Sequence, residues 1–555
     1  MKTMECRGSG DSFCFSAGFF LLAATVLTFA VGAVALLLGG SVEWYVFPLA
    51  TVLAATVTWL LYPGPESVKA VSVASVVIAA AIPLCALLED ASFDGNAYHQ
   101  KAVALMLGGW NPYYTPLPTP LYDPFVAHYA IGMEIISAAI SASVGYIEAG
   151  KTVNFMIIMS VALLGYDFMS SRFGFTRRRR LWITVMAVGN PVCMSQLLTY
   201  YNDFPKYCLL LVTVMAAVTI ASPRSRKEMY VWTGVLSAAI IMSAAVKFNA
   251  FFEQGIAVGA FCIWLAVRRR WHTLRSVIAV SAVAAAGSFA VLCYHPYVTN
   301  WIYTGNPVYP LMGRGAIDIM TYNTPYAVDG MDRFSAFVRS LCEIKIPYYA
   351  EPLGGFGPLM AVMLLLSAVI GVALRRSNIS AYYYIGAWVA ASCFIFPQSW
   401  WARYVSQLWL IPVLAVLSAA SESRVRWINH LQTAVMACGV VTALATAMMA
   451  VRISYPMTVK RQLLYGLTRD TGASIWNASI ESMRHFTERG IPVMEIPVEC
   501  LDSCAIMFFG DDSRWSYPVV NLDSARYERF RLHGGRFGLN PERHRYFVIT
   551  DNTEK

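Results

Sequence analysis

A carboxylate that follows a membrane-length apolar run is the first candidate for chemistry in this sequence. Asp94 lies in the segment Phe93 to Gln100, shortly after the apolar run Val68 to Leu88. Water and lipid meet at such a place, so a carboxylate there can take a proton from a hydroxyl acceptor while the tail of a lipid donor stays in the bilayer. The position of Asp94 therefore indicates the entrance of an active site.

Further charged residues are expected at the same level, at the outer ends of helices. Charges at membrane depth are costly, and residues that carry them are usually functional. Arg403 follows Trp400 and Trp401 in a short turn, and these aromatic side chains are suited to flank a lipid phosphate. The residues that share this expected level with Asp94 are His99, Asp203, Lys206, Lys247, Glu253 and Arg403.

Structural roles remain open for several members of this set. Asp203 stands just before Pro205, which is typical of a helix N-cap. Lys247 and Arg403 are also typical of side chains that extend from a helix end toward the aqueous interface. One histidine among scattered carboxylates is weak evidence for a metal, so we expect His99 to be a supporting polar residue rather than a ligand.

The composition predicts a multi-pass membrane protein. The chain is 57% hydrophobic and 14% charged, with a mean hydropathy of +0.52, whereas soluble domains carry about 25% charged residues. Its formal net charge is +9, but Lys and Arg occur in short clusters between apolar runs, as membrane topology requires. We therefore read no nucleic-acid function from the charge.

Apolar runs long enough to cross a bilayer predict about thirteen transmembrane helices. The first, Phe15 to Leu38, is too long for a signal-peptide core and is expected to remain in the protein. The others are expected near 42 to 62, 68 to 88, 152 to 170, 181 to 199, 206 to 222, 229 to 246, 250 to 267, 276 to 294, 356 to 374, 381 to 397, 405 to 420 and 430 to 451.

The basic clusters predict the orientation of these helices. They fall on one side of the membrane only if the apolar stretch Phe125 to Val144 lies in the interface instead of spanning. The N-terminus is then cytoplasmic and the C-terminal segment extracytoplasmic. The clusters are Arg172 to Arg180, Arg224 to Lys227, Arg268 to Arg275, Arg375 and Arg376, and Arg424 to Arg426.

Two long external loops follow from this topology. Residues 89–151 form the first, with an interfacial helix at Lys101 to Trp110 that Gly108 and Gly109 terminate. Residues 295–352 form the second, which is rich in turn residues and is expected to lack regular structure. Loops of this length tend to carry function.

The last part of the chain differs from the rest in composition. Residues 1–452 are predicted to form the transmembrane domain, and 453–555 a small soluble α/β domain with strands such as Pro492 to Ile496 and Tyr546 to Thr550. Cys500 and Cys504 are spaced for a disulfide, and free thiols are equally compatible with the sequence. The predicted fold is an all-α multi-pass membrane protein that carries this small domain.

The stretch from about Leu87 to Ala420 resembles the GT-C superfamily of integral membrane glycosyltransferases, which use polyprenyl-phosphate-linked sugars. The motifs that carry the resemblance are an early loop acid with its interfacial helix, three turn segments, and a late arginine. They comprise Asp94 with Tyr98 and His99, Trp110 to Tyr113, Gln196 to Asp203, Pro296 to Trp301, Gly305 to Pro310, and Ala402 to Tyr404 followed by Pro412.

The resemblance implies an inverting sugar transfer on the extracytoplasmic face. Asp94 would be the general base, and Arg403 and Lys247 would stabilise the phosphate of the departing lipid. The residues left for acceptor binding or support are Tyr98, His99, Asp203, Lys206 and Asn300. The implied partners are a polyprenyl-phosphate-sugar donor, membrane lipid, and a glycan, lipid or protein acceptor.

The first loop departs from the best-known members of that superfamily because it has no Asp-X-Asp or Glu-X-Asp pair. It offers only Glu89, Asp90 and Asp94. We therefore assign no metal ligands and leave dependence on a divalent cation open. Two other functions use the same external charges: a transporter or flippase for lipid-linked saccharides, and a polysaccharide polymerase or ligase. Asp94 at the interface favours transfer over transport.

Overall fold

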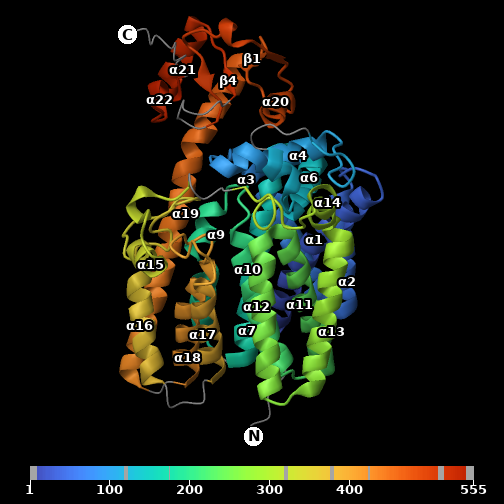
Figure 1. Cartoon of the computed structure of the whole chain (residues 1–555), viewed down its shortest axis with the longest axis vertical. Helices are drawn as coiled ribbons and strands as arrows, with labels where there is room; N and C mark the ends of the chain where they lie inside the picture. The colour runs from blue at the N-terminus through green and yellow to red at the C-terminus, as the bar shows by residue number, and fades with distance from the viewer. Residues whose placement is uncertain are drawn as a thin grey trace.

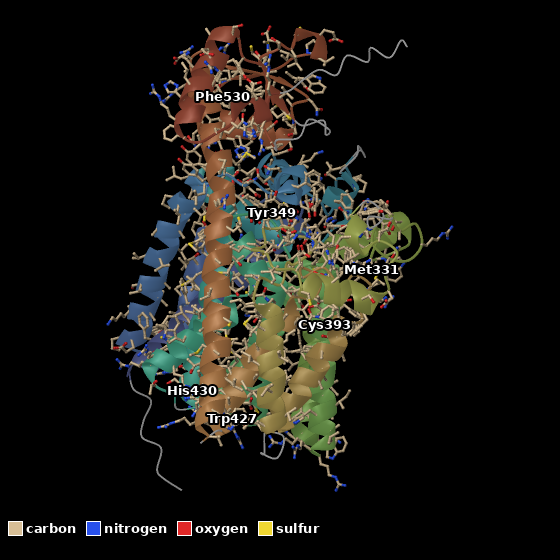
Figure 2. All side chains as sticks on the ribbon, turned by 90° about the vertical axis from the view of Figure 1, so that its left-hand side faces the viewer. Met331, Tyr349, Cys393, Trp427, His430 and Phe530 are labelled. Atoms are coloured by element: carbon tan, nitrogen blue, oxygen red, sulfur yellow. The ribbon has the colours of Figure 1, made fainter. Side chains whose placement is uncertain are left out.

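The computed structural model describes residues 9–117, 123–173, 175–317, 323–374, 380–422, 425–509 and 518–545. It consists of a tall bundle of helices with a small domain on one end (Figure 1). The helix α19 (Arg426–Thr468) runs the height of the bundle and enters that domain. Figure 2 shows Trp427 and His430, near the start of α19, at one end of the molecule and Phe530 of the small domain at the other.

Most helices of the bundle are apolar over most of their length. Within the described residues, eight helices are long and apolar enough to cross a membrane, and four shorter apolar helices accompany them. The long ones are in α1 (Ser9–Leu37), α3 (Pro65–Leu87), the segment Ile147–Phe173 with α7 (Thr152–Phe173), α10 (Phe204–Ala221), α11 (Arg226–Val246), α12 (Phe248–Val267), the segment Trp271–Leu292 with α13 (Trp271–Gly287), and α19. The shorter ones are α2 (Val46–Leu61), α6 (Gly132–Val144), α16 (Met360–Ala373) and the segment Ser406–Ala420 with most of α18 (Leu410–Glu422), and α17 (Ser380–Cys393) lies beside α18. This arrangement confirms the predicted fold class.

Close packing of the first helices fixes the core of the bundle. A Cβ atom on Gly18 of α1 would lie 2.9 Å from the backbone nitrogen of Leu164 in α7, so glycine is what allows these two helices to touch. Ser160 of α7 donates a hydrogen bond of 2.8 Å to the carbonyl of Gly18 at the same crossing. Such close contacts of small residues are typical of helices that associate in lipid.

One predicted helix is broken. The run 181 to 199 contains α8 (Arg177–Val188) and the short α9 (Pro191–Gln196). Pro191 takes the first position of α9, and the side chain of Asn190 accepts a hydrogen bond from the nitrogen of Val192. Proline disrupts a helix interior but is favoured at a helix start, so the chain ends one helix and begins another here.

The stretch Phe125 to Val144 does not form a helix of spanning length. It contains α5 (Asp123–His128) and α6, which has 13 residues where about 20 are needed to span. Helix α6 lies beside α4 (Gln100–Leu107) at the end of the bundle that carries the small domain (Figure 1). Helix α4 ends at Gly108, where the predicted glycine pair stops it.

The second predicted loop contains more regular structure than expected. It includes the short helical turn Tyr294–Val298, α14 (Thr299–Thr304), a 3-10 turn Tyr326–Val328 and α15 (Arg333–Leu341). The side chain of Asp332 accepts hydrogen bonds from the nitrogens of Phe334 and Ser335 and so caps α15. The expectation of an irregular loop was wrong because local capping outweighs the turn residues.

The small domain is a four-stranded sheet with helices. Its strand order is β2-β1-β4-β3, in which β1 and β2 are parallel and the other pairs antiparallel. Its elements are β1 (Ala473–Trp476), α20 (Ile480–Thr487), β2 (Val493–Glu495), the 3-10 turn Val498–Cys500, β3 (Ile506–Met507), β4 (Val519–Val520), α21 (Ser524–Arg536) and α22 (Pro541–His544). The core includes Phe486, Phe508 and Phe530 together with Leu464 and Tyr465 of α19.

Three sequence predictions for this domain have different outcomes. The predicted strand Pro492 to Ile496 contains β2, whereas the strand Tyr546 to Thr550 lies outside the described residues. Helix α19 continues well beyond residue 453, so the first part of the predicted domain is helical and the sheet begins only at Ala473. Cys500 and Cys504 are free thiols in the structure.

Candidate functional site

Asp94 lies at the start of the π-helical turn Gly95–His99, where the chain leaves α3 and its extended continuation. Its side chain is 17% exposed, and its Oδ2 atom lies 3.3 Å from Nη1 and 3.4 Å from Nη2 of Arg403. The two residues are 309 positions apart in the sequence. The structure thus brings the predicted base and the predicted phosphate-binding cation into direct contact.

Aromatic rings surround the guanidinium of Arg403. Its Cζ atom lies 4.6 Å from the ring centroid of Trp401, 5.2 Å from that of Tyr201 and 5.6 Å from that of Tyr404. Tyr201 in turn packs against Tyr349, which Figure 2 places toward the upper end of the bundle. Such rings attract the cation and hold its plane in one orientation.

Asp203 holds Arg403 from the other side. The Nε atom of Arg403 lies 3.4 Å from Oδ2 of Asp203, and Nζ of Lys247 lies 2.5 Å from Oδ1. Asp203 is fully buried; burial alone would raise the pKa of this carboxyl, but Arg403 and Lys247 hold it below its ordinary value. Burial likewise opposes the charge of Arg403, and Asp203 and Asp94 outweigh it and keep the pKa of the guanidinium above its ordinary value.

These contacts decide between the structural and functional interpretations of Asp203. It stands at the N-cap position of α10, but its side chain makes no capping hydrogen bond there. Its carboxylate is used instead for the two cations and for an amide donor, Nε2 of Gln196, at 3.3 Å. The N-cap interpretation is therefore wrong. We name Asp94, Arg403, Asp203 and Lys247 the interface cluster.

Lys206 lies next to this cluster but serves another partner. Its Nζ atom donates hydrogen bonds to Oε1 of Glu253 at 2.8 Å and to the carbonyl of Tyr404 at 2.7 Å. The second bond fixes the turn that carries Arg403. Lys206 is thus placed to support the position of Arg403.

His99 belongs to a second polar group beside the cluster. Its Nδ1 atom lies 2.5 Å from Oε1 of Glu134, and Nδ2 of Asn202 donates to the same oxygen at 2.8 Å. The ring of His99 packs against Tyr98 and Tyr201. Glu134 was missed by sequence reasoning, although an acidic residue within the apolar stretch Phe125 to Val144 was a usable signal.

Tyr98 and Asn300 have different surroundings. Tyr98 packs against Phe125 and Tyr129, and burial followed by the charge of Asp94 raises the pKa of its phenol well above the ordinary value, so it remains a neutral donor. Asn300 donates to the carbonyls of His128 at 3.0 Å and Tyr309 at 2.9 Å. It links the two external loops to each other, and its contacts are not with the interface cluster.

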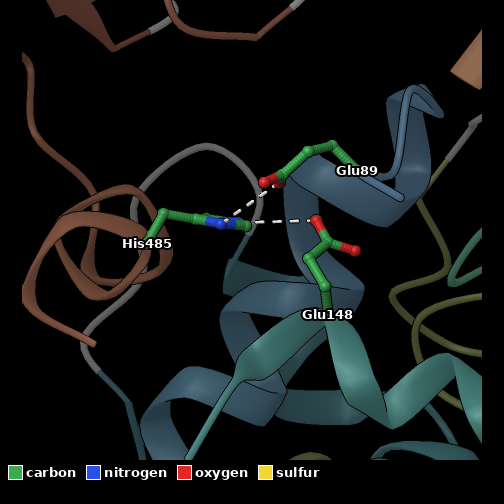
Figure 3. Close-up of side chains that lie close together, drawn as sticks. All are labelled: Glu89, Glu148 and His485. Carbon is green, nitrogen blue, oxygen red and sulfur yellow. Dashed lines mark ion pairs between the residues drawn. The ribbon is translucent and has the colours of Figure 1, made fainter. Parts of the chain in front are cut away.

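A second group of charged residues lies where the small domain meets the bundle. Nη1 of Arg461 in α19 donates to Glu89 at 2.9 Å and to Glu148 at 3.1 Å, and all three side chains are fully buried. His485 of α20 approaches both carboxylates, at 3.5 Å and 3.7 Å (Figure 3). We name this group the junction cluster; its members are Glu89, Asn96, Gln100, Glu148, Arg461, His485, Glu488 and Arg489.

Within the described residues, the side chains that converge closely enough to hold a metal ion are Glu89, Glu148 and His485, with ligand atoms within 4.8 Å of one another. The guanidinium of Arg461 already bonds to both carboxylates, and its positive charge repels a cation at this place. This donor set therefore does not fit a metal ion while Arg461 is in place.

No family model matches this chain, and no curated protein matches it. The solved structures similar to it include the crystal structure of ArnT from Cupriavidus metallidurans bound to undecaprenyl phosphate and that of the same protein in the apo state. The first has 11% sequence identity and a TM-score of 0.47, covering 76% of this chain and 86% of that one. The second has 10% identity and the same TM-score, covering 77% and 86%. The roles assigned to residues therefore rest on the contacts described above.

Proposed function

We propose that this protein is a GT-C-type glycosyltransferase that moves a sugar from a polyprenyl-phosphate-linked donor to an acceptor, with inversion, on the extracytoplasmic face. The observation that carries the proposal is the contact between Asp94 and Arg403 in a partly exposed site. A carboxylate and a guanidinium are the groups that such a reaction needs, one for the acceptor proton and one for the phosphate.

The reaction uses the interface cluster as follows. The acceptor hydroxyl gives its proton to Asp94 while its oxygen attacks the anomeric carbon of the donor. The bond between that carbon and the phosphate oxygen breaks, and its electron pair leaves with the lipid phosphate. Arg403 and Lys247 stabilise the negative charge that collects there, because fixed cations in a poorly hydrated site act more strongly than in bulk water.

The contact between Asp94 and Arg403 also gives an order of events. The Asp94 carboxylate is engaged by the guanidinium of Arg403, so it has to leave that contact before it can turn to an acceptor hydroxyl. A lipid phosphate that binds Nη1 and Nη2 displaces Asp94 and frees it to accept a proton. Asp203 keeps its contact with Nε and so holds Arg403 in place during this exchange. Donor binding therefore precedes activation of the acceptor.

The test is a transfer assay in lipid nanodiscs with a panel of polyprenyl-phosphate sugars. Asp94→Asn is compared with Asp470→Asn, a control at an exposed position at the end of α19. We expect turnover to be lost only in the first variant. Binding of the lipid donor without any transfer by the wild-type protein would contradict the proposal and favour a transporter.

The proposed orientation has its own test. Cysteines placed at positions 101 and 470 should react with an impermeant thiol reagent added outside intact cells, and one placed at 178 should not. The starting protein needs Cys342, Cys500 and Cys504 changed to serine, because these thiols are exposed or partly exposed. Labelling of position 178 from outside would contradict the orientation.

A further inference from the structure

The junction cluster connects the small domain to the turn that carries Asp94. Nη2 of Arg461 donates a hydrogen bond of 2.7 Å to Oδ1 of Asn96, two residues after Asp94. Nδ2 of Asn96 donates to the carbonyls of Asp90 at 3.0 Å and Ser92 at 2.6 Å. Asn96 thus ties the chain before Asp94 to the chain after it, and Arg461 fixes Asn96.

The turn itself is tightly built around these bonds. Residues Gly95–His99 form a π-helical turn, a wide form that occurs frequently at functional sites. A Cβ atom on Gly95 would lie 2.1 Å from a side-chain oxygen of Asp90 and 2.3 Å from that of Ser92. Only glycine fits there, so the path of the chain next to Asp94 depends on how Asp90 and Ser92 are held.

The small domain determines where the guanidinium of Arg461 lies. Its Cζ atom is 4.8 Å from the ring centroid of Phe508 and 4.9 Å from that of Phe509, and both rings belong to the small domain. The domain also reaches the other end of the turn, because Nε2 of His485 lies 2.9 Å from Oε1 of Gln100. The π-helical turn is therefore held at both ends by contacts that depend on this domain.

We propose that the small domain positions Asp94 for catalysis through Arg461 and Asn96. This inference rests on the proposed function for its catalytic part. Arg461 and Asn96 are positioning residues: they touch neither the donor nor the acceptor, and they set the place of the carboxylate that does. The domain then supports the site through two specific residues and contributes no group to the reaction itself.

The test compares Asn96→Ala and Arg461→Lys with Arg489→Lys in the full-length protein. Lysine at 461 keeps a charge for Glu89 but lacks the planar fork that reaches Asn96 as well. Arg489 contacts Glu89, Glu488, the carbonyl of His485 and the rings of Tyr146 and Tyr465, so this variant perturbs the same cluster without touching the turn.

We expect Asn96→Ala and Arg461→Lys to lower kcat by about 10- to 100-fold, since small displacements of a reacting group are costly, with the KM for the lipid donor changed by less than about twofold. Arg489→Lys should leave kcat near the wild-type value. A purely structural role would instead change the Tm of all three variants and leave kcat untouched, which would overturn the proposal.

Amide hydrogen exchange makes the positioning testable even if no transfer is found. Exchange in residues 95–99 should be faster in Asn96→Ala and Arg461→Lys and unchanged in Arg489→Lys. Unchanged exchange in the first two variants would overturn the coupling between domain and turn. An inactive wild-type protein that shows the expected exchange pattern would contradict the proposed function alone.

Discussion

The interface cluster and the junction cluster contain the same kinds of residue but differ in how far water can reach them. In the interface cluster, the side chains of Arg403 and Asp94 are 12% and 17% exposed and meet at 3.3 Å. In the junction cluster, those of Arg461 and Glu89 are fully buried and meet at 2.9 Å. A pair that water can reach can exchange its partner at little cost, whereas a buried pair is costly to separate. The first is suited to take a ligand and the second to hold two parts of the molecule together.

The aromatic surroundings of the two arginines differ in the same sense. Arg403 lies against Trp401, Tyr201 and Tyr404, whose rings carry polar groups that can bond to a ligand. Arg461 lies against Phe508 and Phe509, which offer only an apolar face. Amphipathic rings are common where one side of a site is wet. The rings therefore also indicate that Arg403 can exchange its carboxylate for a ligand, whereas Arg461 keeps its partners.

The strongest test of this comparison is Asp94→Asn. The amide cannot accept the proton, so turnover should fall by about 10²- to 10⁴-fold. Arg403 loses a charged competitor, so binding of a polyprenyl phosphate should be as tight as in the wild type or tighter. Transfer rates and donor binding are measured on the same nanodisc samples. Near-wild-type turnover would remove Asp94 from the mechanism, and weaker donor binding would contradict the displacement of Asp94 by phosphate.

Arg461→Ala should have the largest effect on stability. The change removes the buried guanidinium shared by Glu89 and Glu148, which then keep only Arg489 and Lys151 as cationic partners. Breaking a buried pair costs about 3–5 kcal/mol. The measurement is the Tm in detergent, with Arg403→Ala as the matched variant in the other cluster, where we expect a clearly smaller loss. Equal losses in the two variants would erase the proposed difference between the clusters.

Arg403→Ala and Arg403→Lys test the binding side of the interface cluster. Alanine should weaken binding of the lipid phosphate by about 10-fold or more, because a charge-assisted hydrogen bond is worth about 1.5–3 kcal/mol. Lysine should restore only part of the loss, since it is a point charge without the fork. Equal affinity in the wild type and both variants would show that Arg403 only anchors the chain at the interface.

A smaller effect is expected for the pH dependence of stability, through Glu488 of the junction cluster. The pKa of Glu488 is raised from its ordinary 4.5 to about 7, mainly because the carboxyl is buried; Arg489 and the backbone nitrogen of Ile147 oppose the rise, and Glu89 adds to it. The folded protein then binds this proton more tightly than the unfolded chain, so the contribution of Glu488 to stability is present below about pH 4.5 and is lost as the pH rises through about 7.

Glu488→Gln should therefore flatten the dependence of the free energy of unfolding on pH between pH 5 and 8, by on the order of 1 kcal/mol, and the Tm measured across this range should flatten with it. His485 also faces this group; burial and then Arg461 lower its pKa, so it takes up its proton only at more acidic pH. Because His485 is present in both proteins, the difference between the two curves isolates Glu488. Glu542→Gln, at an exposed position of α22, is the control. Parallel curves for wild type and Glu488→Gln would contradict the assignment.

Apolar runs and charged residues were enough to predict most helices and the residues at their ends. Apolar length predicts a spanning helix because every backbone group must be satisfied in lipid, and this rule placed most helices of the bundle. Charge bias predicted that Phe125 to Val144 does not span, which put Asp94, Asp203, Lys247 and Arg403 at one end of the bundle. The rule from apolar length failed at Asn190, where a helix cap and a proline split an apolar run into two helices.

Which of these charges meet depends on how the helices pack, and no local pattern shows it. The contact of Asp94 with Arg403 joins residues 309 positions apart, and that of Arg461 with Asn96 joins residues 365 positions apart. Local pattern contains no information on such pairs, because they depend on how helices pack and on which buried charge lacks another partner. For the same reason Arg461, within a helical run, became recognisable as a site residue only when its partner Asn96 was in place.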